Sequence, residues 1–187
     1  MKKYVWPSVK LTIVFIILCA VLYPLFIAGV AKLAPGGGKG ETISVNGKIV
    51  GYANIGQKFT DDKYFQGRTS AVDYNAAGSG GSNKGPSNPD YLKLVQERID
   101  SFLVHNPSVK KEEIPTELVT TSGSGLDPDL SPLGAKVQVK RIAAVRKLEE
   151  SKIINLIDKQ TEKPLMGMFG PPKVNVLKLN IELDKLK

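Results

Sequence analysis

The sequence predicts a single N-terminal transmembrane helix followed by an α+β extramembrane domain, which has a small antiparallel sheet and about three helices. Residues 11–31 contain no charged side chain, an Asn-Gly pair separates two short alternating runs, and three later segments repeat apolar residues at helical spacing. We therefore divide the chain into an N-terminal tail (1–10), a transmembrane helix (11–31), a linker (32–42) and an α+β domain (43–187).

The apolar segment 11–31 is long enough to cross a bilayer, because a spanning helix needs about 20 apolar residues. Pro24 removes one backbone hydrogen bond from this helix, and the carbonyl that it leaves free needs another partner in lipid. Ala28 and Gly29 offer a small-residue surface against which a second helix can pack. Two alternatives stay open, a span that packs among partner helices and a lone anchor.

A cleaved signal peptide is the other interpretation of this segment. The apolar region of a signal peptide is about 7–15 residues long, shorter than the segment here, although small residues at 29–31 would permit cleavage. We favour an uncleaved anchor. Three lysines lie near each end of the span, so the short N-terminal tail decides the orientation, since long domains cross membranes largely regardless of charge. We expect a cytoplasmic N-terminus and an extracytoplasmic main domain at the cell membrane.

A hairpin is expected at the start of the domain, after a glycine-rich joint at residues 34–40. Asn46-Gly47 lies between short runs of alternating apolar residues, and this dipeptide favours the positive φ angles of a tight hairpin turn. Residues 60–88 follow with few apolar side chains, and we expect turns there.

Three helices are expected in the rest of the domain. Asn88-Pro89 and Ser131-Pro132 each combine a capping side chain with proline at the first helical position. Apolar residues at helical spacing predict helices over 89–104, from 132 to about 148, and over 150–159.

The C-terminal run LKLNIELD, residues 177–184, alternates apolar and polar side chains. Leucine or isoleucine occupies every second position, and Lys, Asn, Glu and Asp occupy the others. This period of two predicts a half-buried strand at the end of the chain.

The composition argues against several classes of site. The chain has one histidine, His105, and one cysteine, Cys19, too few for a zinc quartet or a Cys/His dyad. The formal net charge is +8, but the basic residues are spread along the chain, whereas nucleic-acid-binding proteins concentrate them on one face. We therefore predict no metal site and no nucleic-acid partner.

Two stretches rich in glycine and serine are candidates for a functional site. SGGSNKGPSNP, residues 79–89, has the small residues and the lysine of a phosphate-binding loop, but Lys84 precedes Gly85-Pro86 and no hydroxyl residue follows it at a helix start. TTSGSGLDPDLSP, residues 120–132, has serines without a nearby histidine, which argues against a Ser/His/Asp triad. Long irregular segments in compact domains commonly carry function, so we expect the two stretches to share one surface patch. Its polar members would be Arg68, Tyr74, Asn83, Asp127 and Gln138.

A series of motifs runs through the whole chain after the apolar segment. They are Tyr64-Phe65-x-Gly67-Arg68-x-Ser70-Ala71, Tyr74-Asn75, Ser79-Gly80-Gly81-Ser82-Asn83-x-Gly85-Pro86-x-Asn88-Pro89, Ser122-Gly123-Ser124-Gly125-Leu126-Asp127-Pro128, Gln138 with Arg141 and Arg146, and Val174-Asn175-Val176-Leu177-x-Leu179-Asn180. With these motifs in this order, the chain resembles the C subunit of the Kdp-type potassium-transporting P-type ATPase. Two positions depart from the family pattern, Thr69 where proline is usual and Asp129 where histidine is common.

The resemblance implies a non-catalytic accessory subunit that is needed for assembly and activity of a high-affinity potassium uptake pump. ATP hydrolysis would belong to the B subunit and the potassium path to the A subunit, with the small F subunit as a further partner. The family's C subunit is described as a catalytic chaperone that raises the ATP affinity of the B subunit, with the Ser/Gly-rich motif and Gln138 as proposed nucleotide contacts. No firmly bound cofactor is implied. The sequence agrees, because it has no Asp-Lys-Thr-Gly phosphorylation motif and no Walker loop.

The motifs also define the expected functional surface. We expect it to contain Phe65, Gly67, Arg68, Ser70, Tyr74, Asn75, Ser79, Gly80, Gly81, Ser82, Asn83, Ser122, Gly123, Ser124, Gly125 and Asp127. Direct ATP contact conflicts with an external domain, so we expect the domain to dock on the external face of the pump, where it stabilises the assembly or gates potassium entry. The alternative is a membrane-anchored external binding module or hydrolase unrelated to transport.

Overall fold

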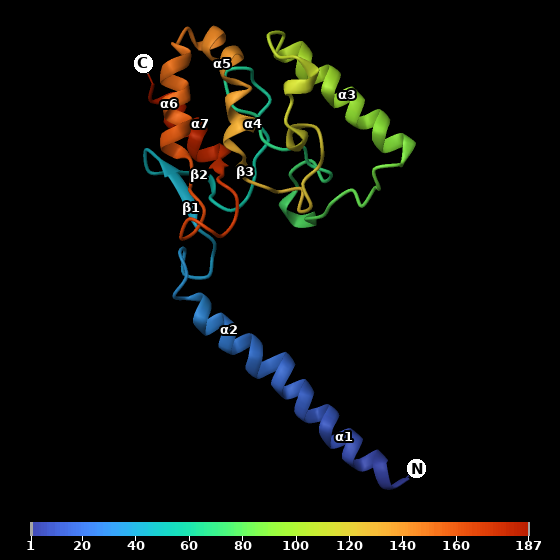
Figure 1. The fold of residues 1–187 in the computed structure, drawn as a ribbon. Helices are drawn as coiled ribbons and strands as arrows, with labels where there is room; N and C mark the ends of the chain where they lie inside the picture. The colour runs from blue at the N-terminus through green and yellow to red at the C-terminus, as the bar shows by residue number, and fades with distance from the viewer. Residues whose placement is uncertain (1, 187) are drawn as a thin grey trace. The chain divides into compact units, whose positions relative to one another are not determined.

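The computed structural model describes residues 2–186, so Met1 of the predicted tail and Lys187 of the predicted domain lie outside the described residues. The chain divides into two compact units, Met1–Thr42 and Ile43–Lys187. The first holds one long helix, and the second holds several helices and two small antiparallel sheets (Figure 1). The predicted fold class is confirmed.

The first unit is a helical rod built from α1 (Lys2–Ile16), a π-helical segment (Ile17–Leu22) and α2 (Tyr23–Ala31). Among the described residues, one helix, Lys3–Ala31, is long and apolar enough to cross a membrane, a property that signal sequences share. The π-helical segment ends just before Pro24, and the amide of Tyr23 donates to the carbonyl of Leu18. The wider turn fits a proline, which has no N–H to donate and whose ring collides with the preceding helical turn.

The second unit begins with the predicted hairpin, β1 (Thr42–Val45) and β2 (Lys48–Tyr52). Asn46 and Gly47 have φ angles of 50° and 78°. Positive φ at both central residues is the geometry of a tight primed turn, which confirms the hairpin.

Two of the predicted helices are confirmed as α3 (Pro89–His105) and α6 (Glu150–Gln160). Asn88 caps α3, because its Oδ1 accepts from the amide of Tyr91 at 3.0 Å. Helix α3 has no buried residue, and in Figure 1 it stands apart from helices α4–α7. Short 3-10 turns cover Ala76–Gly78, Lys111–Glu113 and Thr116–Leu118.

The predicted helix from 132 to 148 is two helices, α4 (Pro132–Lys136) and α5 (Val139–Arg146). Ser131 caps α4 as expected, accepting from the amide of Gly134 at 3.0 Å. The break comes at Gln138, whose side-chain Nε2 donates to the carbonyl of Gly134 at 2.9 Å. The side chain therefore satisfies a carbonyl at the C-terminal end of α4, and a new helix, α5, begins at the next residue.

The strand predicted over residues 177–184 is wrong, because this segment is helix α7 (Val176–Asp184). Asn175 caps the helix, accepting from the amide of Lys178 at 3.0 Å. The buried positions of α7 include Val176, Leu179, Asn180 and Leu183, which recur at helical spacing. The inner face of the helix therefore contains a polar residue, Asn180. The alternation of leucine with polar residues concealed this face.

A second small sheet pairs β3 (Asp129–Leu130) with β4 (Val174–Asn175) in antiparallel register. It joins the segment before α4 to the segment before α7. The core packs around it and is formed by apolar residues from α4–α7 and from both strands, together with Phe65 and Leu118. The largest fully buried apolar side chains are Phe65, Leu130, Ile142, Ile153, Ile157, Leu179, Leu183 and Val174.

Residues 62–66 pass through this core as an irregular strap, which has no strand partner in the described chain. Side-chain amides replace the missing strand. Asn180 accepts from the amide of Phe65 at 2.8 Å and donates to its carbonyl at 3.0 Å. The side-chain amide of Gln138 likewise accepts from the amide of Gln66 at 2.9 Å and donates to its carbonyl at 3.0 Å. Both side chains are buried, and each satisfies the backbone amide and carbonyl that a neighbouring strand would otherwise bond.

Arg141 completes the support of the strap. Its buried guanidinium donates to the carbonyls of Asp62 and, at 3.1 Å, of Tyr64. It also donates to Asn106 at 3.0 Å and to Gln138 at 2.8 Å. Burial lowers the pKa of Arg141, and the nearby carboxylate of Asp62 opposes that shift. The charged form is therefore kept by hydrogen bonds to oxygen atoms on several sides.

Replacing Asn180 by alanine tests the strap. Asn180→Ala leaves the amide and carbonyl of Phe65 without partners in the core, and each unpaired buried group costs about 1–3 kcal/mol. We expect the free energy of unfolding of the full chain in detergent micelles to fall by about 3 kcal/mol in denaturant titrations followed by circular dichroism.

Asn155→Ala is the matched control, because Asn155 lies on the exposed face of α6. It should change stability by less than about 0.5 kcal/mol. Equal effects of the two substitutions would show that the strap does not depend on Asn180.

Candidate functional site

The two glycine- and serine-rich stretches lie against each other in the structure. We call residues 66–83 the first loop and residues 120–128 the second loop. The amide of Ser122 donates to the carbonyl of Thr69 at 3.1 Å, and Thr69 and Thr121 form a parallel bridge. Farther along, the carbonyl of Ser124 accepts from the amide of Gly80 at 2.8 Å and from the Ser79 hydroxyl at 3.0 Å. The loops are therefore joined at both ends by backbone hydrogen bonds.

Serine hydroxyls fill the space between these ends. Ser70 donates to the carbonyl of Gly125 at 2.6 Å, and it accepts from the amides of Val72 and Tyr74. The hydroxyls of Ser82 and Thr121 are 3.2 Å apart. Small hydroxyl residues thus replace the regular ladder that a sheet would supply.

Arg68 and Asp127 connect the loops by an ion pair, with 2.8 Å between Nη1 and Oδ2. Both side chains are about one quarter exposed, so the pair is partly shielded from water. The Tyr74 hydroxyl donates to the carbonyl of Arg68 and so fixes the backbone beside the pair. Burial, and then the charge of Asp127, raise the pKa of Tyr74 to about 12.

Gly125 is a position where the packing requires glycine. Its φ angle is +68°, and a Cβ there would lie 2.6 Å from the Val72 side chain and 2.8 Å from the carbonyl of Gly80. A Cβ on Gly123 would meet nothing within 4 Å. The glycines of the second loop therefore differ, one being required by contact with the first loop and the other lying at the surface.

The predicted surface residues divide into three groups. Asn75, Ser79, Asn83, Gly123 and Ser124 are exposed. A half-buried group consists of Gly67, Arg68, Ser70, Tyr74, Gly80, Gly81, Ser82 and Asp127. Phe65, Ser122 and Gly125 are buried, so Phe65 does not lie on the surface but packs in the core, and the other two support the loops from beneath.

The remaining predicted residues lie elsewhere. Gln138 is fully buried, and its amide bonds with Gln66, Gly134 and Arg141. Pro24, Ala28 and Gly29 belong to the first unit and are exposed along the apolar helix.

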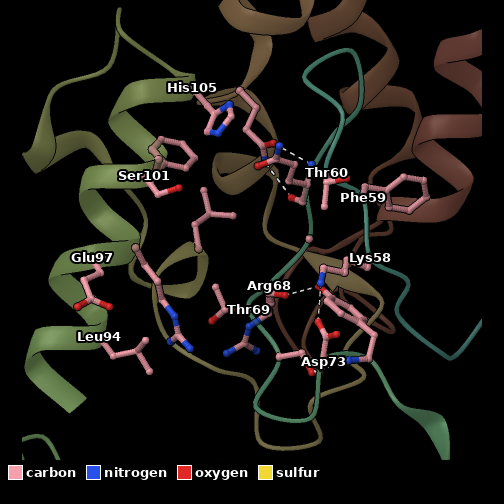
Figure 2. A pocket seen from close by; sticks show the side chains of 18 residues that line it. Lys58, Phe59, Thr60, Arg68, Thr69, Asp73, Leu94, Glu97, Ser101 and His105 are labelled. Carbon is pink, nitrogen blue, oxygen red and sulfur yellow. Dashed lines mark hydrogen bonds and ion pairs between the residues drawn. The ribbon is translucent and has the colours of Figure 1, made fainter. Parts of the chain in front are cut away.

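A cavity of about 450 Å³ lies between the first loop and helix α3. Figure 2 shows Glu97, Ser101 and His105 projecting from α3 on one side, with Lys58, Arg68 and Thr69 on the other. The apolar side chains of Leu94 and Phe102 line the same space. The cavity therefore combines an apolar helix face with the polar surface of the first loop.

Several polar groups around the cavity already have partners. Lys58 pairs with Asp73 at 2.6 Å, and His105 with Asp62 at 2.9 Å. Arg98 donates to the carbonyl of Val119 at 3.1 Å, and burial lowers its pKa.

Two buried polar atoms among the described residues have no hydrogen-bond partner in the protein, Nε of Arg68 and Oγ1 of Thr69. Both residues line the cavity. The Ser122 and Ser124 hydroxyls accept from the amides of Gly125 and Leu126, and the ring of His105 contacts the Asp62 carboxylate.

Sequence reasoning missed the residues that hold the loops from inside, Asp62, Asn106 and Asn180, and the cavity side of α3. The only local signal was a polar residue at an inner position of a helix, as at Asn180. The partners of Asn180 lie 115 residues away in the chain, so no local pattern could have named them.

Comparison with known proteins gives a consistent picture. The family model described as "K⁺-transporting ATPase, c chain" matches residues 5–185. A protein of Flavobacterium psychrophilum named "Potassium-transporting ATPase KdpC subunit" is 60% identical over 185 residues, which cover 99% of this chain and all of the relative. A Flavobacterium johnsoniae protein of the same name has the same identity and coverage. A Bacteroides fragilis protein, also of that name, is 50% identical over 188 residues, covering 99% of this chain and 98% of its own.

Gly125→Ala tests the contact between the loops. The positive φ angle and the close approach to Val72 and Gly80 predict a loss of about 2–3 kcal/mol in the free energy of unfolding. Gly123→Ala is the control and should change it by less than about 0.5 kcal/mol. The measurement is denaturant unfolding of the full chain in micelles, and a Gly125→Ala protein as stable as Gly123→Ala would contradict the packing described.

The raised pKa of Tyr74 predicts a loss of stability in alkali. Below about pH 10 the hydroxyl is neutral in both folded and unfolded chains, so the stability is present in full. Between about pH 10 and 12 only the unfolded chain ionises, and the free energy of unfolding falls by on the order of 2–3 kcal/mol.

Tyrosinate absorbance measures this directly. The native chain should show a titration phase near pH 12, and Tyr74→Phe should remove that phase. A titration that Tyr74→Phe leaves unchanged would refute the prediction.

Proposed function

The chain belongs to the family of the c chain of the K⁺-transporting ATPase, and from this membership we propose that it is a membrane-anchored accessory subunit of an ATP-driven potassium pump. The observation that carries the proposal is the match over residues 5–185, which includes the apolar helix as well as the α+β domain. Relatives that the chain covers from end to end bear the name of the same subunit.

In this proposal the chain supplies no catalytic residue. Among residues 2–186 no group of three or more His, Cys, Asp or Glu side chains is placed to hold a metal ion. ATP hydrolysis then belongs to the B subunit and the potassium path to the A subunit, with the small F subunit as a further partner. The contribution of this chain is to assembly and activity of the complex.

The proposed orientation places the N-terminus in the cytoplasm and the α+β domain outside. The apolar helix Lys3–Ala31 would lie in the cell membrane and pack its Ala28 and Gly29 surface against a helix of a partner subunit. The kink-prone Pro24 would lie within that contact. An isolated anchor would leave the same small residues facing lipid.

The joined loops are the proposed docking surface on the external face of the A subunit. Exposed Asn75, Ser79, Asn83 and Ser124 present hydrogen-bonding groups on a backbone that the inter-loop bonds hold rigid. A rigid polar surface loses little conformational freedom on binding. Docking there would stabilise the assembly or gate potassium entry.

Raising the ATP affinity of the B subunit would then be an effect of docking. Direct nucleotide contact through Gln138 would break the bonds that this side chain makes to Gln66, Gly134 and Arg141 in the core. We assign Gln138 a positioning role beneath the loops. An external domain would also lie on the opposite side of the membrane from cytoplasmic ATP.

A second candidate function is an external binding module. The observation that favours it is the cavity of about 450 Å³, whose lining includes Arg68 and Thr69, each with a buried side-chain atom that has no hydrogen-bond partner. A module of this kind would bind its ligand without any other subunit, which separates it from the pump hypothesis.

The decisive experiment is reconstitution of the pump with and without this chain, followed by potassium-stimulated ATPase activity. The full chain should co-purify with the other subunits and restore activity. Gly123→Arg adds a large side chain at an exposed position with nothing within 4 Å, so it should lower co-purification and activity by about tenfold or more without unfolding the domain.

Ser108→Arg, at another exposed loop position, is the control and should behave like the native chain. Full activity of the pump without this chain would contradict the proposed function. Protease added outside intact cells should digest the α+β domain, and its protection there would overturn the external location.

A further inference from the structure

Residues 161–173 form a hydrogen-bonded arm between α6 and β4, drawn in orange to red in Figure 1. At its base, Glu162 and Lys173 form an antiparallel bridge with backbone bonds of 2.8 and 3.1 Å. At its tip, Leu165 and Phe169 form a second bridge with two bonds of 3.0 Å. The arm is therefore an ordered hairpin that ends in a tight turn.

The tip of the arm is strongly apolar and exposed. Leu165, Met166, Met168 and Phe169 have 70%, 81%, 75% and 62% of their surface open to solvent. Single exposed apolar residues are common, but four large ones at one turn form a patch of the kind that marks an interaction site.

Four backbone amides of the tip already have partners. The amides of Leu165 and Phe169 donate across the bridge, and those of Gly167 and Met168 donate to Pro164 and Leu165 at 2.9 and 3.2 Å. Burying a backbone amide without a partner is expensive in an apolar medium. These bonds therefore lower the cost of moving the tip from water into the interfacial layer.

Lysine outnumbers acidic residues at the base of the arm. Lys159 and Lys163 are exposed, and Lys173 pairs with Asp129 at 2.7 Å and lies 3.7 Å from Glu162. Residues 159–173 contain three lysines and one acidic residue, Glu162. An apolar tip behind a lysine-rich base is the pattern that suits an anionic lipid surface, because lysine is attracted to the headgroups while the tip enters the acyl boundary.

The C-terminal end of the arm also lies close to the place where the tether enters the domain. The side chain of Asn175 in β4 donates at 2.8 Å to the carbonyl of Ala53, just after the hairpin β1–β2 at which the linker ends. Residues 32–42 can span at most roughly 40 Å even when fully extended. If the apolar helix spans a bilayer, the arm is held within reach of the same bilayer.

We propose that the arm at residues 161–173 inserts its apolar tip into the interfacial layer of the bilayer that the N-terminal helix spans. The tip residues enter the boundary between headgroups and acyl chains, and Lys159 and Lys163 contact anionic headgroups. The contact is a second membrane attachment of the domain. This contact requires membrane anchoring of the chain but no other subunit. It can therefore be tested independently of the proposed pump function.

Depth-dependent quenching in vesicles tests the proposal with the full chain. In a Cys19→Ser background, Met166→Cys carries an environment-sensitive nitrobenzoxadiazole label, and Ser108→Cys carries the same label as control. The protein is reconstituted in equal parts of phosphatidylcholine and phosphatidylglycerol containing nitroxide-labelled lipid. The label at residue 166 should be quenched several-fold more strongly than the label at residue 108.

Replacing Met168 and Phe169 by aspartate in the Met166→Cys chain should reduce quenching to the level of the control, because charged side chains are expelled from the interface. Both residues are exposed, so the fold should be retained, with an unchanged circular dichroism spectrum. Equal quenching at residues 166 and 108 in the absence of other proteins would overturn the proposal. Shielding of residue 166 that arises only when pump subunits are added would also overturn it and assign the tip to a protein interface.

Discussion

The fold depends on satisfying the backbone of the strap at residues 62–66, which crosses the core without a strand beside it. Asn180 and Gln138 bond both the amide and the carbonyl of Phe65 and Gln66 respectively, and Arg141 bonds the preceding carbonyls of Asp62 and Tyr64. Because an unpaired buried backbone group costs about 1–3 kcal/mol, these three side chains together decide whether the strap can lie in the core at all.

The strap sets the position of everything that follows it. Phe65 is anchored at the centre of the core, so Gly67 and Arg68 emerge at a fixed point, where Arg68 meets Asp127 and the two loops join. The loops have no apolar core of their own and draw their order from serine hydroxyls, backbone bonds and the absence of a side chain at Gly125. A surface built in this way is both polar and rigid, which are the properties that specific docking requires.

The sequence predicts well those elements whose signals are local. The Asn46-Gly47 turn, the Asn88 cap with its helix and helix α6 are encoded within a few residues of themselves. Prediction failed where a polar side chain serves a distant backbone, since Asn180 made α7 look like an alternating strand and Gln138 concealed the break between α4 and α5. Composition indicated two functional loops, but the bonds that join them link residues about 40 to 60 apart along the chain, beyond any periodic signal.

In the proposed pump subunit, membrane anchoring would explain why a small polar surface can suffice for docking. A span and a short linker would confine the domain to a thin layer beside the bilayer, which would raise its local concentration beside a membrane partner. A second attachment through the arm would further restrict rotation of the domain and so reduce the entropy lost on docking. Under these conditions the joined loops need to supply orientation and specificity more than raw affinity, which agrees with a surface of asparagine and serine rather than aromatic anchors.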